Sequence, residues 1–370
     1  MNSLASRGYI TIVNEAIDLE DGGVSGVALG DTLEFVPEDT PRGVESEGSA
    51  GLPLDIGLAL LETVYGSRPK LPPSGSSRVE FSLHPSRVGY RKEHSIVWEA
   101  EDVDDLRAKY AQPSFTWPNR FSRFIGDKAF GLLVADAIGL PVPRTTVIGR
   151  HVAPFSFGRA TGTGEVWTRP CPDEQKPGEY PTFARWVDPS QLFELDGQSG
   201  KAIVSILAQE GVSAKFSGAT LPGHKSRENL IEGVYGQGEA FMLGVEAPVK
   251  LPPSVKSDLD NLLGEAESQV GRPVRIEWVH DGHQAWVVQF HATTHKSHGA
   301  TIVPGFPANG WLQFLPAAGL DELRHLLDQA AKAGRGIEVV GRIGVTSHVG
   351  DLLRKSDVPA RFSHSGDERD

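Results

Sequence analysis

The 370-residue sequence contains a single cysteine, Cys171, and no apolar run long enough to cross a lipid bilayer. One cysteine excludes an intramolecular disulfide framework and is typical of a reducing compartment, so we expect a cytoplasmic protein. A bilayer span needs about 18 or more consecutive apolar residues, so no membrane-spanning helix is predicted. The N-terminus lacks a basic segment followed by an apolar core, so no secretory signal is predicted.

Positive charge is in the minority. The chain has 36 lysines and arginines against 48 aspartates and glutamates, a formal net charge of −12. A nucleic-acid-binding face requires an excess of basic residues, so that class of partner is disfavoured. A local basic pocket for phosphate groups stays compatible with this charge, and the composition does not indicate an oligomeric state.

Three regions of an α+β protein are predicted, at residues 1–112, 113–300 and 301–370, because domains usually span about 100–200 residues. The first is strand-rich and names no chemistry, so its role stays unassigned. Its expected strands and one helix are Gly8-YITIVN, Asp31-TLEFV, Arg78-VEFSLH, His94-SIVWE and the helix Leu54–Tyr65.

The second region opens with a predicted helix, Asp127-KAFGLLVADAIG. Asp127 suits its N-cap, an apolar stripe follows with helical spacing, and Gly139 is expected to end it. Short strands then follow at Thr145-TVIG, Gly164-EVWTR, Ala202-IVSILAQ, Asn229-LIEGVY, Val274-RIEWV and Gln284-AWVVQF. The third region is predicted to be a small α/β unit with a helix at Asp321-ELRHLLDQAAKAG, a strand at Ile337-EVVG and a helix over Val349–Lys355.

Five segments between residues 121 and 291 occur in a recognisable order. They are Ile125-GDKAFGLLVADAIGLPVP, Glu165-VWTRPCPDE, Ala202-IVSILAQEGVSAKFSGA, Asn229-LIEGVYGQGEAFMLG and Val274-RIEWVHDGHQAWVVQFH. Together they resemble the ATP-grasp nucleotide-binding domain of phosphoenolpyruvate synthase and pyruvate phosphate dikinase. The resemblance implies an ATP-grasp-like fold that binds ATP with Mg²⁺.

Two basic residues match phosphate-binding positions of that family. Lys128 stands at a predicted helix start, where the backbone dipole and an ammonium together favour an anion. Arg169 matches the family arginine, and its planar guanidinium suits phosphate oxygens. The resemblance also implies that Gln209, Glu210 and Val212 line the adenine slot at a hinge. It nominates Glu232 and Glu239 as polar residues of the nucleotide site.

Glu277 and Gln289 match the two side chains that hold Mg²⁺ in the family, with the same spacing of twelve residues. A carboxylate and an amide oxygen beside ATP phosphates are ligands that Mg²⁺ accepts. Asp281-Gly282 marks a hairpin between them. Cross-strand partners share a face with period two, so both side chains lie on one face only if the loop has an odd length. The metal hypothesis therefore predicts an odd loop.

Two histidines bear on turnover. His291 stands where the family has an arginine, and a neutral imidazole binds phosphate less strongly than a guanidinium. Arg342-IGVTSHVGDLLRKSDVPARF is similar to the phosphohistidine domain of the same enzymes, which makes His348 a candidate phosphoryl acceptor at a helix start. A helix-capping or core role for His348 is the alternative.

Further histidines lie close to His291 in the sequence, at His295 and His298, with His280 and His283 just upstream. Their spacing resembles that of zinc ligands. No cysteine joins them, and Mg²⁺ already accounts for the neighbouring carboxylate, so zinc is disfavoured.

The sequence therefore predicts a Mg-ATP-dependent phosphotransferase whose acceptor is unknown. Catalysis would rest on positioning and charge neutralisation. Two alternatives stay open: a nucleotide-binding regulatory protein without turnover, and an ATP-grasp ligase that acts through an acyl phosphate. Fold analogy alone does not separate these chemistries.

Overall fold

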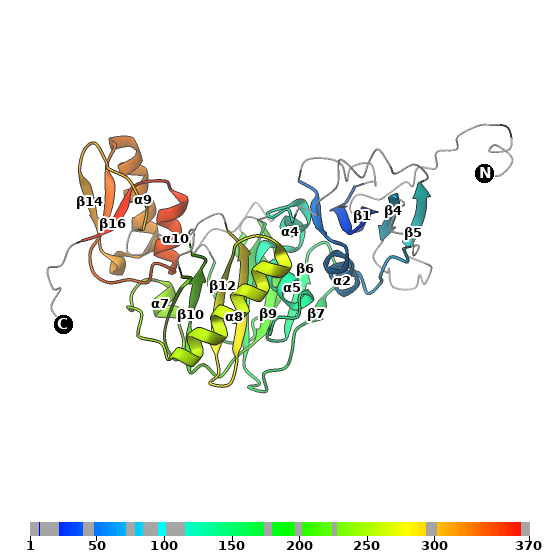
Figure 1. Ribbon diagram of the computed structural model, residues 1–370, viewed down its shortest axis with the longest axis horizontal. Coiled ribbons are helices and arrows are strands. Elements are labelled where there is room, and N and C mark those ends of the chain that lie inside the picture. Colours follow the sequence, from blue (N-terminus) through cyan, green and yellow to red (C-terminus); the bar gives the residue numbers. More distant parts are fainter. Residues whose placement is uncertain are drawn as a thin grey trace. The chain divides into compact units, whose positions relative to one another are not determined.

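A computed structural model of the chain describes residue 7 and residues 22–39, 48–71, 78–83, 95–100, 115–173, 180–196, 202–223, 228–293 and 302–363 (Figure 1). The chain divides into two units. Unit 1 comprises Met1–Phe124 with His151–Ala153, and unit 2 comprises Ile125–Arg150 with Pro154–Asp370. In the described part of the chain, helices occur together with several small sheets, three of them antiparallel and one parallel, so the predicted α+β class is confirmed.

Unit 1 is built on an antiparallel five-stranded sheet of order β3-β2-β1-β4-β5. Its strands are β1 (Val24–Leu29), β2 (Thr32–Pro37), β3 (Ala50–Pro53), β4 (Arg78–Leu83) and β5 (Ser95–Ala100). Helix α2 (Leu54–Tyr65) has the predicted bounds and packs against β2 and β3. The predicted strand at Gly8–Asn14 lies outside the described residues.

Helix α2 ends for a local reason. Its C-cap residue Gly66 has φ +66 and donates its N–H to the carbonyl of Glu62. This left-handed conformation costs a glycine little and closes the last turn. Six buried residues, mostly leucines and isoleucine, line its inner side: Ile56, Gly57, Leu58, Leu60, Leu61 and Val64.

Unit 2 contains two antiparallel four-stranded sheets. The first has the order β7-β6-β9-β8, and the second has the order β11-β10-β12-β13. Their strands are β6 (Thr145–Gly149), β7 (Phe155–Phe157), β8 (Val166–Pro172), β9 (Ile203–Glu210), β10 (Phe216–Leu221), β11 (Leu230–Tyr235), β12 (Val274–His280) and β13 (Ala285–Ala292). The chain passes from β9 in the first sheet to β10 in the second through residues 211–215.

Two long helices cover these sheets. Helix α5 (Asp127–Ala137) packs against β13 and β8, and helix α8 (Pro253–Val270) packs against β12 and β13. Figure 1 shows α8 crossing in front of β12. Helix α8 was not predicted, because its exposed face is strongly polar. Its start carries Pro253 at the first helical position, and its buried residues recur at helical spacing: Val255, Leu259, Leu262, Leu263, Ala266 and Val270.

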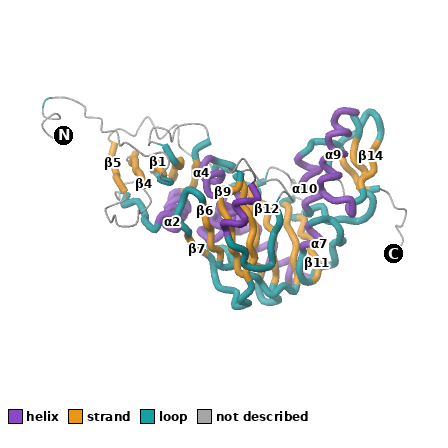
Figure 2. The backbone as a smooth tube through the Cα atoms, turned by 180° about the vertical axis from the view of Figure 1, so that it is seen from behind, coloured by secondary structure: helices purple, strands orange, loops and turns teal. Residues whose placement is uncertain are grey.

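The C-terminal module, residues 302–363, is a parallel sheet of order β14-β15-β16. Its elements are β14 (Trp311–Phe314), α9 (Gly319–Ala333), β15 (Gly336–Val339), α10 (His348–Lys355) and β16 (Ala360–Phe362). Helices α9 and α10 supply the crossovers that parallel strands require. Figures 1 and 2 both place α10 on the side of this module that faces the rest of unit 2.

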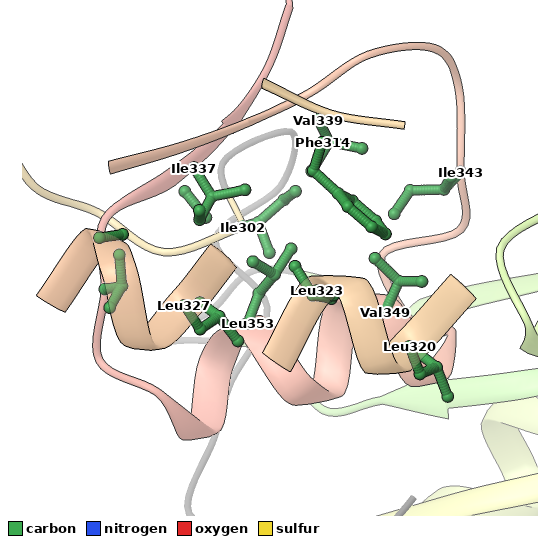
Figure 3. Packing of buried hydrophobic residues seen from close by; sticks show 13 residues of the cluster. Ile302, Phe314, Leu320, Leu323, Leu327, Ile337, Val339, Ile343, Val349 and Leu353 are labelled. Carbon is green, nitrogen blue, oxygen red and sulfur yellow. The ribbon is translucent and has the colours of Figure 1, made fainter. Parts of the chain in front are cut away.

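The module has its own apolar core. Figure 3 shows Leu323 and Leu327 of α9 and Leu353 of α10 pointing into the space beneath the strands. Phe314 at the end of β14 is fully buried there, beside Ile343 and Val349. Burial of a leucine or phenylalanine side chain contributes about 1.5–3 kcal/mol. This core therefore fixes the start of α10 relative to the sheet.

The remaining elements of the described chain are short. They are α4 (Arg120–Ile125), α6 (Pro189–Phe193), η2 (Glu194–Asp196), α7 (Glu239–Met242) and η3 (Pro316–Ala318). Among the residues with described structure, no helix combines the length and the apolar character that a membrane crossing requires.

Candidate functional site

Glu277 on β12 lies directly opposite Gln289 on β13. The loop between the strands has four residues, 281–284, so the predicted odd loop is wrong. A β-bulge corrects the register: Trp278 pairs with Val287 whereas Glu277 pairs with Gln289, so Val288 is the additional residue. The bulge supplies the odd residue that the loop lacks, and it places both side chains on one face.

The carboxylate of Glu277 is largely removed from solvent, with 12% of its side chain exposed. Its Oε1 atom has no hydrogen-bond partner among the described residues and lies 3.6 Å from Nη2 of Arg275. A buried carboxylate oxygen without a partner is costly unless a cation approaches it.

Basic side chains surround that carboxylate. Burial raises the pKa of Glu277, but His348, Arg275, His291 and Arg169, in this order, lower it more, so the pKa falls below its ordinary value. Glu277 is therefore ionised at neutral pH. The charge it carries is available to a metal ion.

Lys128 occupies the first turn of α5. Burial first, and then Arg169, lower the pKa of its ammonium, while Glu277 raises it. Within the described part of the chain, no side chain makes a hydrogen bond or ion pair with this ammonium. The start of a helix and an ammonium without a local partner together make an anion-binding arrangement.

The N-cap of α5 differs from the predicted one. Gly126 holds that position with φ 91, and Asp127 is the first helical residue. A Cβ on Gly126 would lie 2.5 Å from Sγ of Cys171, so only glycine permits this approach. Burial raises the pKa of the Cys171 thiol, which stays a neutral core group beneath the helix start.

Arg169 and Gln209 are bonded to each other. Nη2 of Arg169 donates to Oε1 of Gln209 at 3.1 Å and to the carbonyl of Val288 at 2.7 Å. The amide nitrogen of Gln209 donates to Oγ1 of Thr145. The Gln209 side chain is thus occupied inside the protein. The bond from Arg169 to Val288 also ties β8 to the bulge.

Glu210 ends strand β9, where a glycine-rich loop holds the link to β10. Its Oε1 accepts the N–H of Gly162 at 2.9 Å. The hydroxyls of Thr161 and Thr163 both donate to the carbonyl of Gly211. The loop between β7 and β8 is therefore fastened to the link between the two sheets. Val212 follows in that link and is partly buried.

Three further predicted residues lie in different places. Glu239 is exposed at the first residue of α7. Glu232 on β11 accepts two hydrogen bonds from Thr346, so it contacts the C-terminal module. His291 accepts the amide N–H of Gln289 at Nε2, at 2.5 Å, and its Nδ1 lies 3.4 Å from Oδ2 of Asp127.

His348 is the first residue of α10, and the N-cap is Ser347, whose hydroxyl accepts the N–H of Gly350. The capping role considered for His348 therefore belongs to its neighbour. Burial lowers the pKa of His348; Arg275 and Lys128 lower it further, and Glu277 acts in the opposite direction. The imidazole is neutral at pH 7. The structure thus brings His348 within electrostatic reach of Glu277 and Lys128.

Five residues of this site are partly exposed to solvent: Lys128, Arg169, Glu277, His291 and His348. Arg275 and Gln289 lie deeper, with exposed fractions of 6% and 3%. A phosphate group approaching from solvent would meet the accessible set first.

This geometry suits an oxygen-preferring cation. The side chains of Glu277 and Gln289 are on one face, and Oε1 of Glu277 accepts no hydrogen bond from the described residues. The amide nitrogen of Gln289 is engaged with His291, which leaves its oxygen for a cation. Mg²⁺ usually takes one or two protein oxygens and completes its shell with water and phosphate. Among the described residues, no three His, Cys, Asp or Glu side chains converge as a metal site. His295 and His298 lie outside the described residues.

Comparison with known proteins gives only distant likenesses. No protein-family model matches the chain, and no curated protein matches it. Solved structures that match include D-alanine–D-alanine ligase from Helicobacter pylori, with TM-score 0.31 and 9% identity over 51% of this chain and 57% of that one. Macrocyclase MdnC bound with precursor peptide MdnA from Microcystis aeruginosa MRC matches with TM-score 0.27 and 14% identity, over 50% of this chain and 58% of the other.

The chain spans little more than half the length of either structure. Neither name concerns phosphoenolpyruvate synthase, and no finding from these comparisons is specific to that family. At these scores the likenesses carry no conclusion about the reaction. The chemistry has to be argued from the residues around Glu277.

Two residues of the site were absent from the prediction. Arg275 is a buried cation between the apolar residues Val274 and Ile276, and a charge inside a buried strand was the available signal. Thr346 precedes His348 by two residues, and nothing in the sequence showed that it would contact Glu232.

Proposed function

We propose that unit 2 binds Mg-ATP at the face formed by Glu277 and Gln289 and transfers a phosphoryl group to His348. The observation that carries this proposal is the position of Arg275, which lies 3.6 Å from Glu277 and donates to the carbonyl of Thr346, two residues before His348. Lys128, at the start of α5, is close enough to Glu277 for that carboxylate to raise its pKa. These are the residue types that a phosphoryl transfer needs: cations for phosphate and a neutral imidazole as acceptor.

The protein's own groups would act by position and charge. Lys128 and the start of α5 would hold phosphate oxygens. Glu277 and the oxygen of Gln289 would hold Mg²⁺, which supplies charge neutralisation on the phosphates when bound. The link after β9 would face the adenine through Val212, because the side chains of Gln209 and Glu210 and the N–H groups of Glu210 and Gly211 are already hydrogen-bonded inside the protein.

The transfer itself needs a nucleophile without a proton on the attacking nitrogen. The lowered pKa of His348 meets this condition at neutral pH. The ring nitrogen forms a bond to phosphorus, the bond from phosphorus to the bridging oxygen breaks, and the electron pair leaves with the nucleotide. The proton on the other ring nitrogen is then released to solvent.

His348→Asn is expected to abolish labelling of the protein by radioactive ATP and to leave Mg-ATP affinity within about twofold. Asparagine can retain the polar contacts of one ring nitrogen but cannot accept a phosphoryl group. The label should be acid-labile and alkali-stable, as phosphohistidine is. Parallel reactions with β- and γ-labelled ATP identify which phosphoryl is transferred. His325→Asn, an exposed histidine on α9, is the matched control.

The second candidate is a ligase that acts through an acyl phosphate, the class of chemistry that the sequence left open. It would use the same residues to hold the nucleotide. ATP turnover that His348→Asn leaves unchanged would favour it. Tight Mg-ATP binding without label or turnover would favour a regulatory protein.

A further inference from the structure

Glu232 joins the sheet of unit 2 to the segment that carries His348. Its Oε2 atom accepts the backbone N–H of Thr346 at 2.8 Å and the hydroxyl of the same residue at 2.9 Å. Thr346 is fully buried. Two hydrogen bonds to one ionised oxygen are stronger than neutral ones, so this contact restrains the segment two residues before His348.

The backbone around this contact is fitted closely to unit 2. A Cβ on Gly344 would lie 2.3 Å from the ring of Phe241, which is itself fully buried, and 3.3 Å from Oε2 of Glu232. On the opposing side, Gly244 has φ +76, and a Cβ there would lie 2.8 Å from Cγ2 of Val349. Because Gly344 and Gly244 have no Cβ, the segment before α10 can lie close to Phe241, and Val349 can lie close to the backbone at Gly244.

Arg275 forms a second connection to the same segment. Its Nη2 donates to the carbonyl of Thr346 at 2.6 Å, and its Nη1 lies 3.3 Å from Oδ1 of Asp351 in α10. Thr346 is thus held by its N–H and hydroxyl through Glu232 and by its carbonyl through Arg275. The N–H, the hydroxyl and the carbonyl of Thr346 are therefore all hydrogen-bonded to two side chains of the sheet β11-β10-β12-β13.

We propose that Glu232 is a positioning residue that seats residues 344–348 on unit 2, so that His348 faces Glu277, and that it does not bind nucleotide. The proposal rests on the function proposed above. It assigns to Glu232 a different role from the one its sequence motif implied. Release of Thr346 from Glu232 would free the His348 segment while leaving Lys128, Glu277 and Gln289 in place.

Hydrogen exchange of the full-length protein, read by mass spectrometry, tests the seating directly. Glu232→Ala should raise the exchange rate of peptides covering residues 344–351 about tenfold or more, the effect of losing a charged hydrogen bond at a buried group. Glu232→Gln keeps an oxygen that both donors of Thr346 can use, so it should restore most of the protection. Glu246→Ala, an exposed glutamate after α7, is the control and should change nothing.

Gly344→Ala provides a second variant, because its Cβ would press on Phe241 and on Oε2 of Glu232 while the Glu232 carboxylate itself is kept. It should raise exchange in the same peptides as Glu232→Ala. In both variants Mg-ATP affinity, measured by calorimetry, should stay within about twofold of the parent. The rate of His348 labelling at saturating ATP should fall while the ATP concentration for half-maximal rate stays the same.

The outcomes separate this role from the proposed function. Absence of any label on His348 in the parent would overturn phosphoryl transfer, yet the exchange and affinity measurements would still decide on Glu232. Unchanged exchange at residues 344–351 in Glu232→Ala would overturn the positioning role. So would a loss of Mg-ATP affinity equal to that of a Glu277 variant, since it would place Glu232 in the nucleotide site.

Discussion

Glu277→Gln is expected to remove the enhancement of ATP binding by Mg²⁺. The substitution keeps the shape of the side chain and removes the charge that a divalent cation requires. In the parent, Mg²⁺ should tighten ATP binding by about tenfold or more, a difference of roughly 1.4 kcal/mol. In the variant, affinities with Mg²⁺ and with a chelator should converge.

Without metal, Glu277→Gln is expected to change ATP affinity in the opposite direction, and this is the more decisive result. Metal-free ATP carries its full negative charge and meets Glu277 together with Lys128 and Arg169. Loss of the carboxylate removes a repulsive charge from this set, so Glu277→Gln should bind metal-free ATP at least as tightly as the parent. A variant that simply unfolded the site would lose both affinities.

Isothermal titration of parent and variant, each with Mg²⁺ and with chelator, gives the four affinities needed. Glu265→Gln, an exposed glutamate on α8, controls for the change of net charge. Gln289→Leu should also abolish the Mg²⁺ enhancement, because it removes the second oxygen. If Glu277→Gln retained the full enhancement, the metal assignment and the nucleotide site built on it would both be wrong.

Asp351→Asn is expected to destabilise unit 2 by roughly 3 kcal/mol, the cost of removing one partner from a buried ion pair. Oδ1 of Asp351 lies 3.3 Å from Arg275 and 3.8 Å from Arg354, and both arginines are buried. Without the carboxylate, the two guanidinium groups remain close together, and among the described residues the remaining acidic partner within ion-pair distance is Glu277, 3.6 Å from Arg275. The contact with Lys355 adds little, because that lysine is 45% exposed.

The effect should depend on pH in one direction. Burial raises the pKa of Asp351, but Arg275, Lys355 and Arg354 lower it far more, so the folded-state pKa lies well below the ordinary 3.8. The unfolded chain then takes up a proton more readily than the folded one. The stabilisation is therefore complete above about pH 5 and is lost as the pH falls below 3.8 toward the folded pKa.

Urea unfolding followed by circular dichroism at pH 7, 5 and 3 measures this dependence. The difference in unfolding free energy between parent and Asp351→Asn should be equal at pH 7 and 5 and smaller at pH 3. Asp328→Asn, an exposed aspartate on α9, should show no difference at any pH. A constant difference down to pH 3 would mean that Asp351 is not ionised beside Arg275 in the folded protein.

The sequence by itself determined the local elements with strong periodicity. Helix α2 has its predicted bounds, and the observed bounds of α5, α9 and α10 lie within a few residues of the predicted ones. Apolar spacing and glycine at helix ends are local signals, so the sequence alone contains them. Helix α8 escaped prediction because most of its surface is polar. The short strand β15 was predicted because it carries the β-branched residues Ile337 and Val339, whereas the similarly short β14 and β16 contain none and were not predicted.

The tertiary structure alone decided how the candidate site is assembled. The sequence could nominate Glu277 and Gln289 but not the bulge at Val288 that puts them on one face, since register depends on pairing with β12. It could nominate His348 but not the contacts that hold the segment of residues 344–348 against the sheet. Those contacts depend on Glu232 and Arg275, which are distant in sequence and become neighbours of the segment only when the C-terminal module packs against unit 2. Local pattern determines which chemistry each segment carries, whereas long-range burial of charge and backbone determines which segments meet.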